Sequence, residues 1–211
     1  FSSFYYGYIY SIFNTDIHHY SIILEPYFDI LNDYKINKDI FVLYGNGQIH
    51  LFKFLSNFFE INLVTIGIIN QLFFSTKFIL FFFILKFFVN DFFSIIGTFI
   101  YYFLYTFVQT PTSDVLASFF LHLFILFYLY NYKFNNIFVI IVSSFILFFS
   151  IYFRHTYILN FAIFIPLLFF LNFFFREKFL YEIKILIVFL FILFVFFIIL
   201  YFQDRLTLWL E

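Results

Sequence analysis

The sequence contains no cysteine, and this absence removes several kinds of chemistry. Without thiols there can be no disulfides, no Cys-ligated zinc site and no thiol nucleophile. Charged residues are also scarce, at 11% of 211 residues, whereas soluble proteins have about 25%. The net charge is -1 and no basic tract is present. Nucleic acid is therefore not expected as a partner, because binding it needs a basic patch.

The abundant residues are apolar. Hydrophobic residues make up 65% of the chain, with 46 Phe and 18 Tyr, and a chain of this composition would aggregate in water. We therefore expect an integral membrane protein. Methionine is absent even at position 1, and the chain stops at Glu211 soon after a new polar stretch begins. For this reason we expect the sequence to be a fragment.

After about residue 62, long apolar runs alternate with short polar connections. A membrane-spanning helix takes about 20 apolar residues. The pattern predicts an all-α fold, a polytopic transmembrane helix bundle forming a single truncated domain. Residues 1–13 are expected to end a first span, 14–61 to form an outer loop, and 203–211 to begin the next outer loop. The six further spans are predicted at about 62–89, 92–108, 114–130, 136–152, 157–175 and 180–202.

The predicted outer loop contains two amphipathic stretches. In the first, apolar residues recur at helical spacing from Ile23 to Tyr34, and acidic residues fall mostly on the other face. This predicts a helix lying on the membrane surface, which Pro26 is expected to divide or kink. Tyr44-Gly45-Asn46-Gly47 is a turn signal. After it, residues 48–60 predict a second interfacial helix, or the entry to the next span.

The two ends of the predicted spans differ in charge. The connections at 131–133 and 176–178 are basic, so the positive-inside rule makes their side cytoplasmic. The predicted location is a bacterial inner (plasma) membrane, with a site that faces outward. Four polar segments collect on the outer side, namely 14–60, 109–114, 154–155 and 203–205.

Several short motifs follow one another in the sequence. Asp16-Ile17-His18-His19 follows the first apolar stretch, and Tyr44-Gly45 ends a step that contains lysine. Pro111-Thr112-Ser113-Asp114 opens a span, and Arg154-His155-Thr156 follows another. This order resembles the GT-C class of membrane glycosyltransferases over about residues 10–175. Within that class it looks most like the bacterial branch near the dolichyl-phosphate-mannose-protein mannosyltransferases. The other matching residues are Pro26, Asp29-Ile30-Leu31, Asp39-Ile40-Phe41 and Pro166.

The resemblance implies an enzyme that moves a hexose or pentose from a polyprenyl-phosphate donor to a glycan, lipid or protein acceptor. Such a transfer needs a carboxylate to take the proton of the acceptor hydroxyl, and positive charge for the departing phosphate. Asp16 is the candidate catalytic base, and capping of the following helix is its alternative role. Arg154 is the candidate phosphate contact, and snorkelling to the interface is its alternative role.

The other candidate substrate-binding residues are His18, His19, Tyr44, Asp114 and His155. Adjacent residues on a helix point about 100° apart, so His18 and His19 are poor joint ligands for one metal. No cofactor is expected, and a divalent metal held with Asp16 is the alternative. For Asp114 we favour a helix N-cap over a wall of the site. His122 lies within a span, where a helix–helix hydrogen bond is the expected role.

Two other classes of protein remain open. A transporter or permease would place ionisable groups in the middle of the membrane, as Lys77, Lys86 and His122 do. Against it, no inverted repeat is visible and most charges lie at helix ends. A structural subunit of a membrane complex would use the outer loop for docking, and would not be stable alone.

Overall fold

The described part of the chain is entirely helical. A computed structural model describes residues 17–32, 34, 46–106, 112–131, 136–154, 156–158 and 179–202. Within these ranges there is no strand, so the predicted all-α fold is confirmed. The helices are α2 (Ile17–Leu31), α3 (Asn46–Leu55), α4 (Leu63–Leu85), α5 (Asp91–Thr106), α6 (Thr112–Asn131), α7 (Ile137–Phe153) and α9 (Phe179–Phe202).

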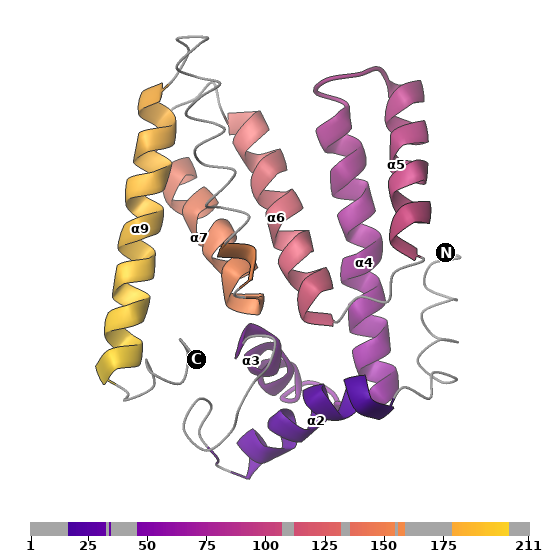
Figure 1. Cartoon of the computed structure of the whole chain (residues 1–211), viewed down its shortest axis with the longest axis vertical. Helices are drawn as coiled ribbons and strands as arrows, with labels where there is room; N and C mark the ends of the chain where they lie inside the picture. The colour runs from indigo at the N-terminus through magenta and orange to yellow at the C-terminus, as the bar shows by residue number, and fades with distance from the viewer. Residues whose placement is uncertain are drawn as a thin grey trace.

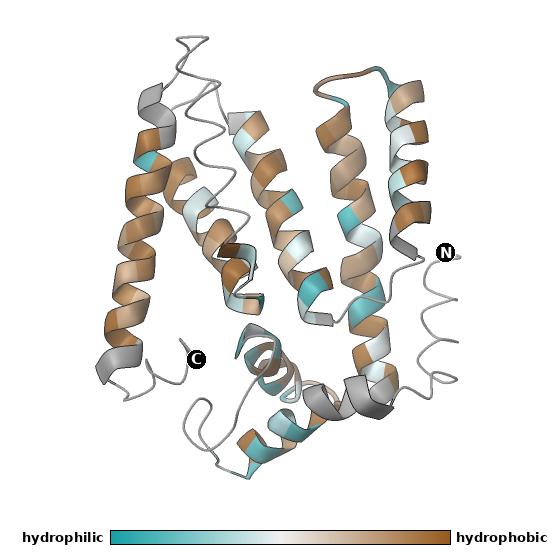
Figure 2. Cartoon of the chain, viewed as in Figure 1, coloured by the Kyte–Doolittle hydropathy of each residue, from teal (hydrophilic) through white to brown (hydrophobic). Residues whose placement is uncertain are grey.

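The helices that stand side by side are α4, α5, α6, α7 and α9, and the shorter helices α2 and α3 lie across one end (Figure 1). Helix α6 packs between α4 and α7, α5 packs on α4, and α9 packs on α7. Helices α2 and α3 contact each other, and α3 also contacts α6 and α7. Figure 2 shows that polar residues are concentrated on α2 and α3, whereas the five standing helices are mostly apolar. We call the end that carries α2 and α3 the capped end.

The described helices follow the predicted spans closely. Helix α4 ends earlier than expected because the backbone turns over Lys86–Phe88. Two helices, over Val64–Leu85 and Ser113–Tyr130, are long and apolar enough to cross a membrane. Shorter apolar segments occupy Asp91–Leu104, Ile137–Phe153 and Ile183–Ile199. The predicted span at 157–175 lies outside the described residues, apart from its first two.

Asparagines start three of the helices. The side chain of Asn62 accepts a hydrogen bond from the Thr65 amide at the start of α4, at 3.0 Å. Asn90 does the same before α5, and Asn136 before α7. Each satisfies a first-turn amide that has no partner within its own helix. The short polar connections therefore define where the apolar helices begin.

The first amphipathic helix runs through Pro26 without a break, so Pro26 does not divide it. Part of its apolar face is buried inside the protein. Tyr27 and Ile30 pack with Ile49 and Phe52 of α3 and with residues at the start of α4. Leu31 on the same helix is 47% exposed. Helix α2 is therefore held to the bundle, and only some of its apolar side chains remain to contact a membrane surface.

The predicted turn at residues 44–47 is corrected by the structure. Asn46 and Gly47 form the first residues of α3 instead, and Tyr44 and Gly45 lie outside the described residues. The helix continues only to Leu55, because side chains then bond to backbone carbonyls. Ser56 Oγ donates to Lys53 O at 2.7 Å and Asn57 donates to Phe54 O. Such bonds end a helix by competing with its own backbone pattern.

Small polar residues let α7 approach its neighbours closely. Ser150 Oγ donates to Ala117 O of α6 at 2.9 Å, and Ser144 Oγ lies 3.3 Å from Ile185 O of α9. All these serine side chains are buried. Small residues and interhelical hydrogen bonds are the usual means by which helices associate in a membrane.

Replacing Gly47 with alanine is expected to loosen the capped end. A Cβ at this position would lie 2.9 Å from Tyr152 Cδ1 and 3.0 Å from the Tyr152 carbonyl, which cannot easily move. Overpacking of this kind costs about 1–3 kcal/mol. Thermal unfolding of the purified protein in detergent should show a lower melting temperature for Gly47→Ala.

Gly97→Ala is the matched control within α5. There the new Cβ would meet only the end of the Leu85 side chain, at 2.8 Å, which can rotate away. We expect no loss of stability, since alanine favours a helix interior over glycine by about 0.5–1 kcal/mol. Equal melting temperatures for the two variants would contradict the close packing of α3 on α7.

Candidate functional site

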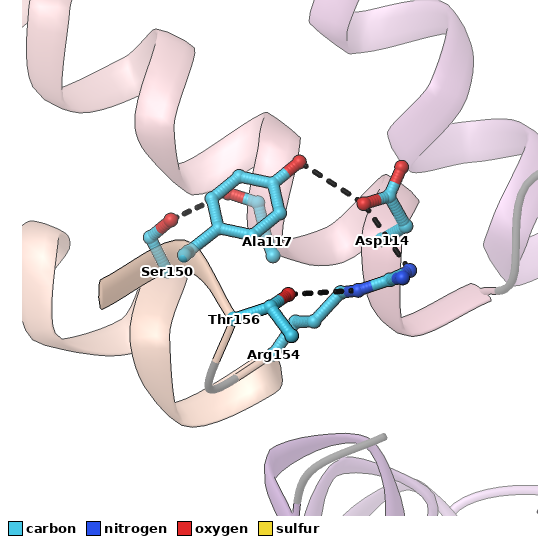
Figure 3. A network of polar contacts seen from close by, with 6 residues as sticks. Asp114, Ala117, Ser150, Arg154 and Thr156 are labelled. Atoms are coloured by element: carbon cyan, nitrogen blue, oxygen red, sulfur yellow. Dashed lines mark hydrogen bonds and ion pairs between the residues drawn. The ribbon is translucent and has the colours of Figure 1, made fainter. Parts of the chain in front are cut away.

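A carboxylate, a guanidinium and a phenol meet at the capped end of the bundle (Figure 3). Arg154 Nη1 lies 3.3 Å from Asp114 Oδ1, and Tyr157 Oη donates to the same oxygen at 3.2 Å. A tyrosine phenol has an ordinary pKa of about 10, so it is protonated and able to donate at neutral pH. Residues from α6 and from the chain after α7 are thereby joined across a sequence separation of about 40 residues.

The local backbone presents Arg154 to this group. Arg154 follows the last residue of α7 and has an extended conformation, with φ -150° and ψ 107°. Its amide donates to Ser150 O, and its side-chain Nε donates to Thr156 Oγ1 at 3.2 Å. The planar guanidinium is thus oriented from two sides, by Asp114 and by Thr156.

The ion pair is only partly exposed to solvent. The side chain of Arg154 is 23% exposed and that of Asp114 is 17% exposed. Charges in such a position are screened less by salt than fully exposed ones. Asp114 is the third residue of α6, so it lies inside the first turn and not at the predicted N-cap. Its carboxylate is used to hold Arg154 and Tyr157.

This arrangement suits recognition of a phosphate group. A guanidinium carries five N–H donors in a planar fork, more than a single carboxylate can use. It matches phosphate oxygens with two parallel hydrogen bonds. Asp114 and Thr156 restrict the rotation of the Arg154 side chain, and this reduces the entropy lost when a ligand binds.

The structure places the predicted site residues unevenly. It brings Asp114 and Arg154 into direct contact. His18 and His19 belong to the first turn of α2, but their side chains lie outside the described part. The predicted residues Asp16, Tyr44 and His155 are also outside the described residues.

Tyr157 is a member of this group that the sequence reasoning missed. A tyrosine at the start of a predicted span suggests an anchor at the membrane interface, so its contact with Asp114 was not foreseen. The available signal was its spacing, three residues after Arg154 and beside Thr156. That spacing could have suggested a shared partner, but not which residue it would be.

A second polar group lies in the interior, between α4, α5 and α6. Lys77 is completely buried. Its Nζ lies over the rings of Phe74, Phe78 and Tyr101, at 4.9, 5.1 and 5.7 Å from their centroids. Contacts of this kind stabilise a cation through the negative face of each ring.

His122 belongs to the same interior group but does not form the predicted helix–helix hydrogen bond. Its Nδ1 lies 2.7 Å from Ser118 O, within α6. Because a carbonyl only accepts, Nδ1 carries the proton in this contact. The ring stacks on Tyr101 at 5.7 Å and meets the edge of Phe81 at 5.8 Å. His122 therefore bridges α6 to its neighbours through its ring.

Within the ranges that the structure describes, no three His, Asp or Glu side chains lie close enough together to hold a metal ion. The chain was also compared with protein-family models, with curated proteins and with solved structures, and none of them matches it.

Proposed function

We propose that this protein is a multi-pass membrane glycosyltransferase of the GT-C type. The enzyme transfers a sugar from a polyprenyl phosphate to an acceptor on the outer side of a bacterial inner membrane. The observation that carries the proposal is the Arg154–Asp114 pair at the capped end, where a guanidinium is held at the end of an apolar bundle. A lipid-linked phosphate would lie at such a boundary, with its charge near the interface and its chain among the helices.

The outer faces of the helices support a multi-pass arrangement. Helices α5 and α9 expose large apolar side chains, including Phe92 at 66%, Leu104 at 67% and Phe191 at 64%. Exposed apolar surface of this extent in water favours aggregation. In a bilayer the same side chains contact lipid tails. The faces that pack together instead contain serines and aromatic rings, as helix contacts in membranes do.

The proposed reaction is a single displacement with inversion. The acceptor hydroxyl oxygen attacks the anomeric carbon, and the bond from this carbon to the phosphate oxygen breaks. The hydroxyl proton passes to the carboxylate of Asp16, which directly precedes α2 in the sequence. The negative charge that remains on the lipid phosphate is stabilised by Arg154. Asp114 and Tyr157 act as positioning residues for that guanidinium.

The test is an assay of sugar transfer by the full-length protein in proteoliposomes. These contain polyprenyl phosphate loaded with radiolabelled mannose, glucose or arabinose, together with a membrane extract as the source of acceptor. Label should move from the lipid to the acceptor only when the protein is present. If none of the three sugars is transferred, the proposed reaction is wrong.

A permease is the second candidate, and the interior group favours it. Lys77 and His122 lie in the middle of their helices. Transporters place their substrate and proton sites at this depth, near the centre of the membrane. The same proteoliposomes distinguish the two functions. A transferase makes a new glycosidic bond, whereas a permease moves the lipid or solute across the membrane unchanged.

A further inference from the structure

Three polar side chains from three helices each have a buried atom without a hydrogen-bond partner in the described part of the chain. The atoms are Gln48 Nε2 on α3, Asn70 Oδ1 on α4 and Ser113 Oγ on α6. Gln48 is 3% exposed and Ser113 is completely buried. Folded proteins contain few such atoms, because each loses its hydration without compensation. Three such atoms on helices that share one apolar cluster point to a polar ligand near this cluster.

The three residues lie next to one apolar cluster, which contains Leu116, Ala117 and Phe153. Each of the three residues stands three positions before an apolar residue that belongs to this cluster. Residues three positions apart lie on the same face of a helix. Helices α4 and α6 start at the same end of the bundle (Figure 1), so both polar residues lie on the side of the cluster nearer the capped end. The pairs are Gln48 and Leu51 on α3, Asn70 and Phe73 on α4, and Ser113 and Leu116 on α6.

This place adjoins the Arg154 site. Ser113 directly precedes Asp114, whose carboxylate holds Arg154. Gly47, the neighbour of Gln48, lies against Tyr152 and Phe153, which lead into Arg154. A ligand whose phosphate contacts Arg154 would therefore have its attached group close to Ser113 and Gln48, and Asn70 adjoins the same apolar cluster through Phe73.

The three atoms together suit hydroxyl groups. The amide nitrogen of Gln48 donates, the amide oxygen of Asn70 accepts, and the hydroxyl of Ser113 does both. None of the three side chains carries a charge. A second anion would meet the Asn70 oxygen and the nearby Asp114 carboxylate, which is unfavourable, whereas a sugar hydroxyl can both donate and accept.

We propose that Gln48, Asn70 and Ser113 bind the hydroxyl groups of the sugar carried by the lipid phosphate. This inference rests on the proposed function and adds the residues that recognise the glycosyl group. Sites that hydrogen-bond a substrate hydroxyl discriminate strongly against ligands that lack it, since their buried polar groups are then left unpaired. The bare lipid phosphate should therefore bind less tightly than the lipid that carries sugar.

The experiment compares two ligands in nanodiscs that contain the full-length protein. One is polyprenyl phosphate, and the other is the same lipid carrying mannose, glucose or arabinose. The wild type should prefer one sugar-bearing lipid over the bare lipid. In Gln48→Met, Asn70→Leu and Ser113→Ala, this ratio of dissociation constants should fall by about 2- to 10-fold per variant, the worth of one hydrogen bond. Binding of the bare lipid should not change.

Ser143→Ala is the matched control. Ser143 is also completely buried, but its hydroxyl donates to Val139 O at 2.8 Å within its own helix. The control should leave the ratio unchanged. Melting temperatures of the three test variants should equal or exceed that of the wild type, because each substitution removes a buried atom that has no partner.

The outcomes separate this inference from the proposed function. If the wild type binds bare and sugar-bearing lipids equally, the sugar site is wrong while phosphate binding stands. If the wild type prefers sugar but the variants keep the full preference, other residues bind the sugar, and the three atoms are satisfied by water. If neither lipid binds, both the sugar site and the proposed glycosyltransferase function are wrong.

Discussion

Asp16→Asn is expected to lower the rate of sugar transfer by about 10²–10⁴-fold, the usual contribution of a positioned general base. Asparagine has nearly the same size as aspartate but cannot accept a proton at neutral pH. Asparagine and aspartate are also comparable helix caps, so the start of α2 should be preserved. The measurement is kcat for transfer from the sugar-bearing lipid by purified full-length protein, with the melting temperature and donor affinity recorded beside it.

A capping role for Asp16 makes the opposite prediction for turnover. The variant would then keep close to the wild-type rate. Glu25→Gln is the control on α2. Glu25 is exposed, and its replacement by glutamine removes the same charge as Asp16→Asn does. Wild-type turnover in Asp16→Asn, together with loss of turnover in Glu25→Gln, would show that the base is misassigned. Full activity in both would place the chemistry elsewhere in the protein.

Arg154→Lys is expected to raise the donor KM by about 10- to 100-fold while leaving the melting temperature near that of the wild type. Lysine keeps the charge that compensates Asp114 but loses the planar fork that binds two phosphate oxygens. A hydrogen bond to a charged group contributes about 1.5–3 kcal/mol, which corresponds to this change in affinity. Steady-state kinetics with varied concentrations of the sugar-bearing lipid give the KM. The dissociation constant of bare polyprenyl phosphate reports the contact with the phosphate alone.

Lys86→Ala is the control for Arg154. Lys86 was predicted to lie within the membrane, but it is the residue that ends α4 and it forms an ion pair with Asp91 at 3.0 Å. That pair lies at the opposite end of the bundle from α2 and α3 (Figure 1). Its removal should leave the donor KM unchanged. If Arg154→Lys changes only the stability and not the donor KM, Arg154 is a structural residue that closes the end of α7.

Within the described residues, much of the secondary structure could be read from the sequence because it depends on local patterns. Apolar runs predicted α4, α5, α6, α7 and α9, and the structure places an asparagine as the cap before three of them, α4, α5 and α7. The alternation that predicted the second amphipathic helix is also visible, since Ile49 and Phe52 are buried while His50 and Lys53 are exposed.

The errors arose where local rules compete. The dipeptide Asn46-Gly47 is a strong turn signal, but here it opens α3. Glycine is needed at this position because the backbone of α7 leaves no room for a side chain. Pro26 remains within a helix whose Tyr27 and Ile30 are packed on both α3 and α4. In both cases tertiary packing outweighed the intrinsic preference of the residue.

By itself, the sequence determined that the chain is helical, where most of the helices lie, and that Asp114 and Arg154 stand at helix ends, since each of these depends on residues close together in the chain. Only the tertiary structure decided which of these groups meet. The contact of Asp114 with Arg154 and Tyr157 requires α6 and α7 to pack in one register. The position of Gln48 and Ser113 beside one apolar cluster likewise requires α3 to pack against α6 and α7. Local sequence patterns do not reveal such contacts, because the packing that joins the helices depends on residues far apart in the chain.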